Sequence, residues 1–236
     1  MTDSQTITTI DRAHLKQLIK SETERFAAEH PRSRQLFERA QKHFVSGVPM
    51  NWMVKWAGSF PVFVKEAKGA HFTDVDGNSY IDFCLGDTGA MTGHSPDATV
   101  QAINEQIQKG ITLMLPYEDV IWVGEELQRR FKLPYWQFAL TATDANRFVL
   151  RMARMLTERP KILVFNYCYH GSVDETFITL DEEGTPMSRP NNMGPQVNPL
   201  QTTKVIEFND IAALETALSA RDVAAVLAEP VMTNIG

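Results

Sequence analysis

The fold is decided by one stretch of the chain, FALTATDANRFVLRMARMLTERPKILVFNYCYHG, which runs from Phe138 to Gly171. An apolar segment that ends at Leu140 predicts a strand, and residues 144–156 predict a helix. The apolar run from Lys161 to Phe165 predicts a second strand. A strand, a helix and a strand in this order indicate a parallel sheet that is covered by helices.

The turn between the first strand and the helix is rich in hydroxyl groups and reads Thr141-Ala142-Thr143-Asp144-Ala145. A helix N-terminus offers unpaired N–H groups and the positive end of the helix dipole, which suit a phosphate. Tyr169, at the end of the neighbouring strand, can cover a flat ring attached to that phosphate. A phosphate and a flat ring together indicate pyridoxal phosphate. Taken alone, the turn is a plain capped helix start and Tyr169 an ordinary core tyrosine.

The composition is that of a globular protein that can bury a real core. The chain has 236 residues, of which 43% are hydrophobic, and a net charge of −6 with scattered basic residues. Nucleic acid and a membrane surface are therefore not expected as partners. Cys84 and Cys168 show no metal-site spacing and no disulfide framework. No segment has the apolar run needed to span a bilayer, so we expect a soluble, cytoplasmic protein without a metal site.

The first part of the chain mixes helices with short strands. The expected elements are helices over 11–29 and 33–44, strands over 62–64, 70–73 and 80–83, and helices over 97–109 and 118–131. Pro31 interrupts the first two helices, and Asp76-Gly77 supplies the turn of a hairpin. Residues 45–59 have no period and form an aromatic loop.

The second part alternates strands with helices. Strands are expected over 136–140, 161–165, 204–207 and 223–228, and helices over 144–156 and 210–218. We expect an α/β fold with a mainly parallel sheet covered by helices, preceded by a smaller mixed segment. The predicted boundaries are 1–94 for the N-terminal helices and β-meander, and 95–236 for the first part of a large α/β domain.

Several short motifs in this order resemble the first half of a class III, fold-type I pyridoxal-phosphate aminotransferase. They are Leu36-Phe37-Glu38-Arg39-Ala40, Asp74-Val75-Asp76-Gly77-Asn78 leading into Tyr80-Ile81-Asp82, Gly93-His94 before Pro96, the helix from Ala145 to Arg154, Tyr169-His170-Gly171 and Glu229-Pro230-Val231. The chain is most similar to the glutamate-1-semialdehyde 2,1-aminomutase group. The resemblance covers 33–236 and implies the aspartate aminotransferase-like fold.

The resemblance also implies which residues contact the cofactor. They are Thr141, Ala142 and Thr143 at the phosphate, Tyr169 on the pyridine ring, His170 in a supporting role, Glu229 at the end of a parallel strand, and Asn234. Ala142 replaces a glycine of the family. Its Cβ is expected to weaken phosphate binding if this position needs a positive φ or close approach to the anion.

The substrate side departs from the aminomutase pattern. Aminomutase relatives place an arginine in the loop equivalent to residues 48–56, where it suits a substrate carboxylate, and this loop has none. Trp52 and Met53 instead predict an apolar wall for an aromatic or alkyl group; packing on a partner subunit is an equal alternative, because the family builds its sites at a homodimer interface. Asp87 is predicted to meet an amine or hydroxyl of the substrate.

The family uses a lysine to attach the cofactor and a carboxylate beside the pyridine nitrogen, and both follow the Glu-Pro segment. Neither is found before Gly236, so no catalytic residue is assigned, and we expect the natural protein to be about twice this length. The predicted activity is transfer of an amino group from a primary amine or amino acid to a keto acid or aldehyde. Alternatives are an aminomutase, a non-catalytic paralogue that acts as a partner subunit, and an unrelated nucleotide-binding protein, although no phosphate loop of that kind is present.

Overall fold

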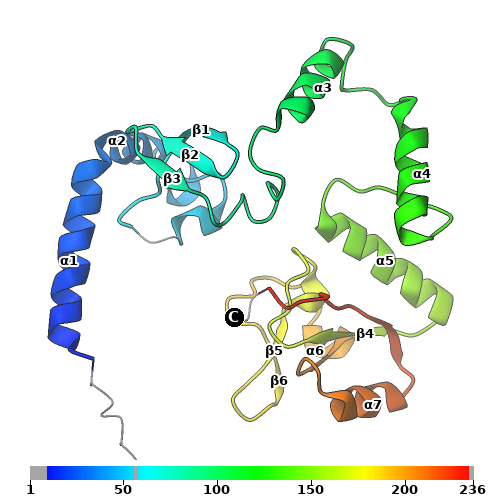
Figure 1. Cartoon of the computed structure of the whole chain (residues 1–236). Coiled ribbons are helices and arrows are strands. Elements are labelled where there is room, and N and C mark those ends of the chain that lie inside the picture. The colour runs from blue at the N-terminus through cyan, green and yellow to red at the C-terminus, as the bar shows by residue number, and fades with distance from the viewer. Residues whose placement is uncertain (1–9, 56–57, 234–236) are drawn as a thin grey trace, which may run out of the picture. The chain divides into compact units, whose positions relative to one another are not determined.

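The computed structural model describes residues 10–55 and 58–233, and the chain divides into two compact units, Met1–Pro116 and Tyr117–Gly236. Each unit is described by itself (Figure 1). The contacts thus divide the chain after Pro116, whereas the sequence predicts a boundary after His94, which stays a prediction about the domains of the protein.

The first unit begins with two helices, α1 (Arg12–Glu29) and α2 (Pro31–Ala40). Asp11 caps α1, because its carboxylate accepts hydrogen bonds from the Ala13 and His14 amides. Pro31 separates the helices as predicted, but it does so as the first residue of α2, where a proline costs no hydrogen bond. The helix predicted to reach Phe44 ends at Ala40.

A small antiparallel sheet follows, in the order β1 (Val64–Lys68), β2 (His71–Asp74) and β3 (Ser79–Ile81). The first strand begins two residues later than the sequence pattern predicts. The predicted aromatic loop contains two single turns of 3-10 helix, η1 (Val45–Gly47) and η2 (Asn51–Val54). The predicted hairpin turn is confirmed, since Gly77 has a φ of 95° and its amide donates to the Asp74 carbonyl.

Asp74 joins the helices of this unit to the sheet through a buried polar network. Its fully buried carboxylate accepts hydrogen bonds from Tyr80 and from the Asn78 side chain at 2.9 and 3.0 Å. His30, the residue between α1 and α2, lies 2.5 Å from the Tyr80 hydroxyl. Burial works against ionisation, but these hydrogen bonds outweigh it and lower the pKa of Asp74.

Two helices lie in the middle of the chain, α3 (Asp97–Ile107) in the first unit and α4 (Asp119–Phe131) in the second. Both agree with the predicted helices, and their ends differ from the prediction by no more than two residues. Lys132 ends α4 in the left-handed conformation, with a φ of 59°.

The second unit is built on a parallel sheet in the order β7 (Thr203–Ile206), β4 (Lys161–Phe165) and β8 (Val223–Val226). Helix α5 (Ala142–Thr157) precedes β4, and α7 (Ile211–Ser219) joins β7 to β8. Figure 1 shows α5 and α7 beside this sheet. The apolar strand β4 is central, and Ile162, Leu163 and Val164 are fully buried. The predicted parallel α/β arrangement is confirmed.

Two features of this unit differ from the sequence prediction. Residues 136–140 form no strand, and Phe138 and Leu140 are 69% and 101% exposed, because no strand among the described residues pairs with them. The pattern also missed a hairpin and two short helical turns. These are β5 (Ile178–Leu180), β6 (Pro186–Ser188), η3 (Asp174–Thr176) and α6 (Pro199–Thr202).

Asp222 ties together the starts of two strands. Its carboxylate pairs with Lys161 of β4 at 3.1 Å and with Lys204 of β7 at 2.6 Å. Hydrogen bonds from Lys204 and Lys161 lower the pKa of Asp222 to about 2. The carboxylate is therefore charged at neutral pH, where it faces both lysines.

We expect Asp222→Asn to destabilise the second unit at neutral pH, because two lysines lose their counter-charge. The folded pKa lies below the ordinary value, so this stabilisation is present above the ordinary pKa and is lost as the pH falls toward about 2. Urea denaturation across pH checks this, with Glu215→Gln on the exposed side of α7 as the control. A difference from the unmodified protein that stays constant down to acidic pH would contradict the assignment.

Candidate cofactor site at the start of helix α5

Thr141 caps the N-terminus of α5. Its hydroxyl oxygen accepts a hydrogen bond from the Asp144 amide at 3.1 Å, and the hydroxyl donates to the Asp144 carboxylate at 2.8 Å. Its carbonyl accepts from Ala145. The N-cap is thus Thr141, whose side chain is engaged within the turn, and its contact with the cofactor phosphate stays a prediction.

The loop that follows β4 packs on the first turn of α5. The Ser172 amide donates to the Thr143 hydroxyl oxygen at 3.0 Å, and the Asn146 side chain donates to the His170 carbonyl at 3.1 Å. Gly171 lies between these contacts with a φ of 75°. A Cβ at Gly171 would lie 2.1 Å from the Thr143 hydroxyl oxygen, so only glycine allows this close approach.

The first turn of α5 has hydrogen-bond donors that are available to an anion. Ala142 is exposed, and the amides of Ala142 and Thr143 have no hydrogen-bond partner in the described part of the chain. The Thr143 oxygen is fixed by Ser172, which leaves its hydroxyl proton available to a ligand. Two amides, one hydroxyl and a helix dipole are the groups that bind a phosphate, so the residues present fit the phosphate of the predicted cofactor.

The backbone at Ala142 is not strained by the alanine that replaces the family glycine. It is the first residue of α5 and has a helical conformation, and the described residues with positive φ do not include it. An alanine is a favourable residue at this position of a helix. The condition of a positive φ is therefore not met at Ala142, whereas the effect of the Cβ on phosphate affinity stays a prediction.

Tyr169 lies beside this turn, and its side chain is 59% exposed. Its amide donates to the Glu229 carboxylate at 3.0 Å. The other Glu229 oxygen accepts from the Thr233 hydroxyl at 2.6 Å. Glu229 therefore lies at the predicted edge of the sheet and contacts the main chain that carries Tyr169.

Glu229 and His170 both have pKa values below their ordinary values, which favours a charged Glu229 and a neutral His170 near neutral pH. Burial raises the pKa of Glu229, but hydrogen bonds from Thr233 and Tyr169 outweigh it, and the net pKa is lowered. Burial lowers the pKa of His170, against the attraction of Glu229. His170 is only 7% exposed, and its Nε2 has no partner among the described residues. The supporting role of His170 stays a prediction.

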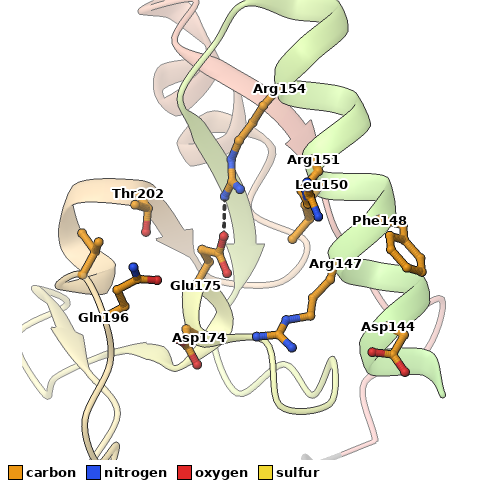
Figure 2. A pocket seen from close by; sticks show the side chains of 11 residues that line it. Asp144, Arg147, Phe148, Leu150, Arg151, Arg154, Asp174, Glu175, Gln196 and Thr202 are labelled. Carbon is orange, nitrogen blue, oxygen red and sulfur yellow. Dashed lines mark hydrogen bonds and ion pairs between the residues drawn. The ribbon is translucent and has the colours of Figure 1, made fainter.

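A separate cavity of about 420 Å³ lies along the side of α5. Figure 2 shows its lining and the ion pair between Arg154 and Glu175, at 2.7 Å. Its charged residues are three arginines and three acids, namely Arg147, Arg151, Arg154, Asp144, Asp174 and Glu175. This balance gives no net attraction for an anion, and neither Ala142 nor Thr143 lines the cavity. Asp144 is the one residue of the N-terminal turn that lines the cavity.

The residues predicted to meet the substrate belong to the first unit, so their relation to the α5 turn stays a prediction. Trp52 and Met53 lie in η2, and the Trp52 side chain is 44% exposed. Asp87 is exposed and lies in a run with φ between 51° and 68°, which spans 85–88. Left-handed backbone costs about 1–2 kcal/mol per non-glycine residue and collects at functional sites. Asn234 lies outside the described residues.

Lys161 and Lys204 stand at the starts of their parallel strands, where both pair with Asp222. Tyr169 and the α5 turn lie at the opposite end of β4, because β4 ends at Phe165. Neither lysine is placed to react with a ligand at that turn. No group of His, Cys, Asp or Glu suited to a metal ion occurs in the part of the chain that the structure describes. Within that part, no helix is both long and apolar enough to cross a membrane.

Helices around a parallel sheet in this arrangement are the architecture of a fold-type I pyridoxal-phosphate-dependent transferase, and solved structures of this class share it. The chain belongs to the class-III aminotransferase family, whose model matches residues 52–236.

Curated relatives support this assignment. A glutamate-1-semialdehyde 2,1-aminomutase of Methanocaldococcus jannaschii is 34% identical over 208 residues, which are 87% of this chain and 48% of the relative. One of Polaromonas naphthalenivorans is 35% identical over 210 residues, which are 86% of this chain and 47% of the relative. The chain thus spans about half the length of the curated relatives it matches.

Solved structures give the same result. A glutamate-1-semialdehyde-aminomutase from Pseudomonas aeruginosa PAO1 is 52% identical with a TM-score of 0.92, over 96% of this chain and 50% of that one. A variant of it was solved in complex with PMP. An omega-transaminase from Sphaerobacter thermophilus is 29% identical with a TM-score of 0.77, over 87% of this chain and 48% of that one.

Sequence reasoning missed three residues of this region: Asn146, Gly171 as a contact residue, and Arg189. Arg189 donates from Nη2 to the Cys168 carbonyl at 2.6 Å. A glycine after Tyr-His is a signal that sequence alone offers for Gly171. Arg189 gives no such signal, because it follows a hairpin that the pattern did not predict.

We expect Gly171→Ala to disrupt the site and Gly184→Ala to leave it intact. Both glycines have positive φ, 75° and 78°, so both variants cost about 1–2 kcal/mol in backbone strain. Only Gly171→Ala adds a clash with Thr143, worth about 1–3 kcal/mol more. Urea denaturation measures the difference between the two variants. Equal losses of stability would show that the Gly171–Thr143 approach is not tight.

Proposed function

We propose that the chain supplies the phosphate seat and the ring cover of a pyridoxal 5'-phosphate site in an aminotransferase. The enzyme transfers an amino group from a primary amine or amino acid to a keto acid or aldehyde. The observation that carries this proposal is the pair of unpartnered amides at Ala142 and Thr143 beside the exposed Tyr169. Family membership supports the choice of cofactor.

The residues of this chain bind and orient the cofactor. The amides of Ala142 and Thr143 and the Thr143 hydroxyl donate to the phosphate. The Tyr169 ring would cover the pyridine ring, because an aromatic side chain suits a flat, electron-poor partner. When bound, the cofactor supplies an electron sink for the bonds at the amine carbon. Neither Lys161 nor Lys204, which lie at the starts of their strands, is placed to attach it.

An aminomutase, which returns the amino group to the same molecule, is the second candidate. The printed names of the relatives and of the 52% identical structure favour it. Against a substrate with a carboxylate to be held there, the loop over 48–56 has no arginine. Trp52 and Met53 there favour an aromatic or alkyl substituent. We further propose that the protein acts in the cytoplasm as a homodimer.

The two reactions differ in what must be supplied. An aminotransferase needs both an amine donor and a carbonyl acceptor, whereas an aminomutase converts a single amino aldehyde without an added acceptor. We expect the intact protein to consume an aromatic or alkyl amine only when a keto acid is present, as followed by chromatography of both products. Turnover of glutamate-1-semialdehyde alone, with no use of the amine pair, would favour the aminomutase instead.

Removing the Thr143 hydroxyl is expected to weaken both the cofactor and inorganic phosphate. We expect Thr143→Val to reduce both affinities about tenfold, since a hydrogen bond to a charged group is worth about 1.5–3 kcal/mol. Tyr169→Ala is expected to weaken pyridoxal 5'-phosphate by a similar factor and to leave inorganic phosphate unchanged. Titration calorimetry on the intact protein measures both.

Thr157→Ala at the far end of α5 is the matched control, because its hydroxyl bonds only the Ala153 carbonyl and the Arg159 amide at that end. It is expected to bind both ligands as the unmodified protein does. The assignment of the phosphate seat is wrong if Thr143→Val binds both ligands as tightly as Thr157→Ala.

A further inference from the structure

A single peptide group, the one that joins Cys168 to Tyr169, is held on both sides by charged side chains. Arg189 donates to its carbonyl at 2.6 Å, and Glu229 accepts from its N–H at 3.0 Å. Arg189 comes directly after β6 and Glu229 follows β8, so the two arrive from separate parts of the unit. A guanidinium on the oxygen and a carboxylate on the nitrogen fix the orientation of this peptide plane.

The neighbouring main-chain groups are held in the same way. β4 ends at Phe165, and Tyr167 then takes a φ of 61°, which turns the chain out of the sheet. Beyond this point the His170 carbonyl accepts from the Asn146 side chain and the Ser172 amide donates to Thr143. Side chains therefore replace the ladder hydrogen bonds that a longer strand would have provided.

Both charged groups are themselves anchored. The Arg189 amide donates to the Phe177 carbonyl at 2.9 Å, which fixes the root of its side chain at the end of the β5–β6 hairpin. Glu229 has its second oxygen engaged by Thr233. The Cys168 side chain beneath the peptide is 1% exposed, so the peptide plane cannot rotate without disturbing packed atoms.

We propose that Arg189 and Glu229 are positioning residues, which orient Tyr169 for the cofactor ring by clamping the Cys168–Tyr169 peptide. Glu229, predicted from the sequence as a cofactor contact, then acts through Tyr169. The benefit of such a clamp is preorganisation, because the ring need not be ordered when the ligand binds. This inference rests on the proposed function and adds a role for two residues that need not touch the ligand.

The experiment compares the binding of pyridoxal 5'-phosphate and of inorganic phosphate by variants of the intact protein. Arg189→Met is expected to weaken pyridoxal 5'-phosphate about tenfold and to change inorganic phosphate less than about twofold. Arg159→Met is the matched control, because Arg159 also donates to a main-chain carbonyl, that of Val223, at the opposite end of the sheet. It is expected to bind both ligands normally.

A double-mutant cycle tests whether the effect passes through the Tyr169 ring. Arg189→Met placed in the Tyr169→Ala protein is expected to cause no further loss of cofactor affinity. Hydrogen exchange gives a readout without ligand: the Tyr169 amide is expected to exchange faster in Glu229→Gln than in the unmodified protein. If Arg189→Met does not fold cooperatively, Arg189→Lys, which keeps a charged donor, is expected to fold and to bind the cofactor with intermediate affinity.

The outcomes separate this inference from the proposed function. If the unmodified protein binds pyridoxal 5'-phosphate but Arg189→Met binds it equally well, or loses as much in the Tyr169→Ala background, the clamp is overturned and the function stands. An equal loss for inorganic phosphate also overturns the clamp, because the defect is then general. If the unmodified protein does not bind pyridoxal 5'-phosphate at all, both proposals fail.

Discussion

One constraint shapes the second unit: main-chain polar groups must find hydrogen-bond partners where the chain leaves the sheet. Strand β4 pairs its main-chain groups with β7 and β8, and the last of these hydrogen bonds joins the Asn166 amide to the Ile206 carbonyl of β7, just beyond Phe165. An unpaired main-chain group costs about as much as a lost hydrogen bond when it is buried. The chain answers with side chains from α5, from the residue after β6 and from the segment after β8. These contacts bring together the pieces of the candidate site, so the same bonds that stabilise the loop also define the place where a ligand can bind.

The sequence predicted the parallel sheet and the start of α5, because these rest on local signals. β4 is a continuous apolar run, and Asp210 and Thr141 are residues that cap helices. The parts that failed depend on distant partners. Residues 136–140 have the composition of a strand, yet a strand needs a neighbour, and no described strand pairs with them. The β5–β6 hairpin was missed because its strands are only three residues long.

The candidate site divides in the same way. Thr143 and Tyr169 were predicted from residue type and place along the chain, and the structure brings their segments together at the start of α5. Arg189 could not be predicted, since its contact depends on where an unpredicted hairpin ends. Whether Ala142 needs a positive φ could not be read from the sequence, and in the structure this helix start needs no left-handed residue there. The chemistry of a site residue can thus be predicted from the sequence, whereas the residues that support it can be identified only from the fold.

The link between Arg189 and Tyr169 gives the β5–β6 hairpin an importance that its small size conceals. The hairpin lies at the surface, where Met187 is 37% exposed, and surface hairpins accept replacement easily during evolution. A substitution in the hairpin that shifts the backbone of Arg189 by a fraction of an ångström would tilt the Tyr169 ring. Homologues with identical ligand contacts can then differ in their affinity for a flat ligand, because of changes in a hairpin that does not contact it.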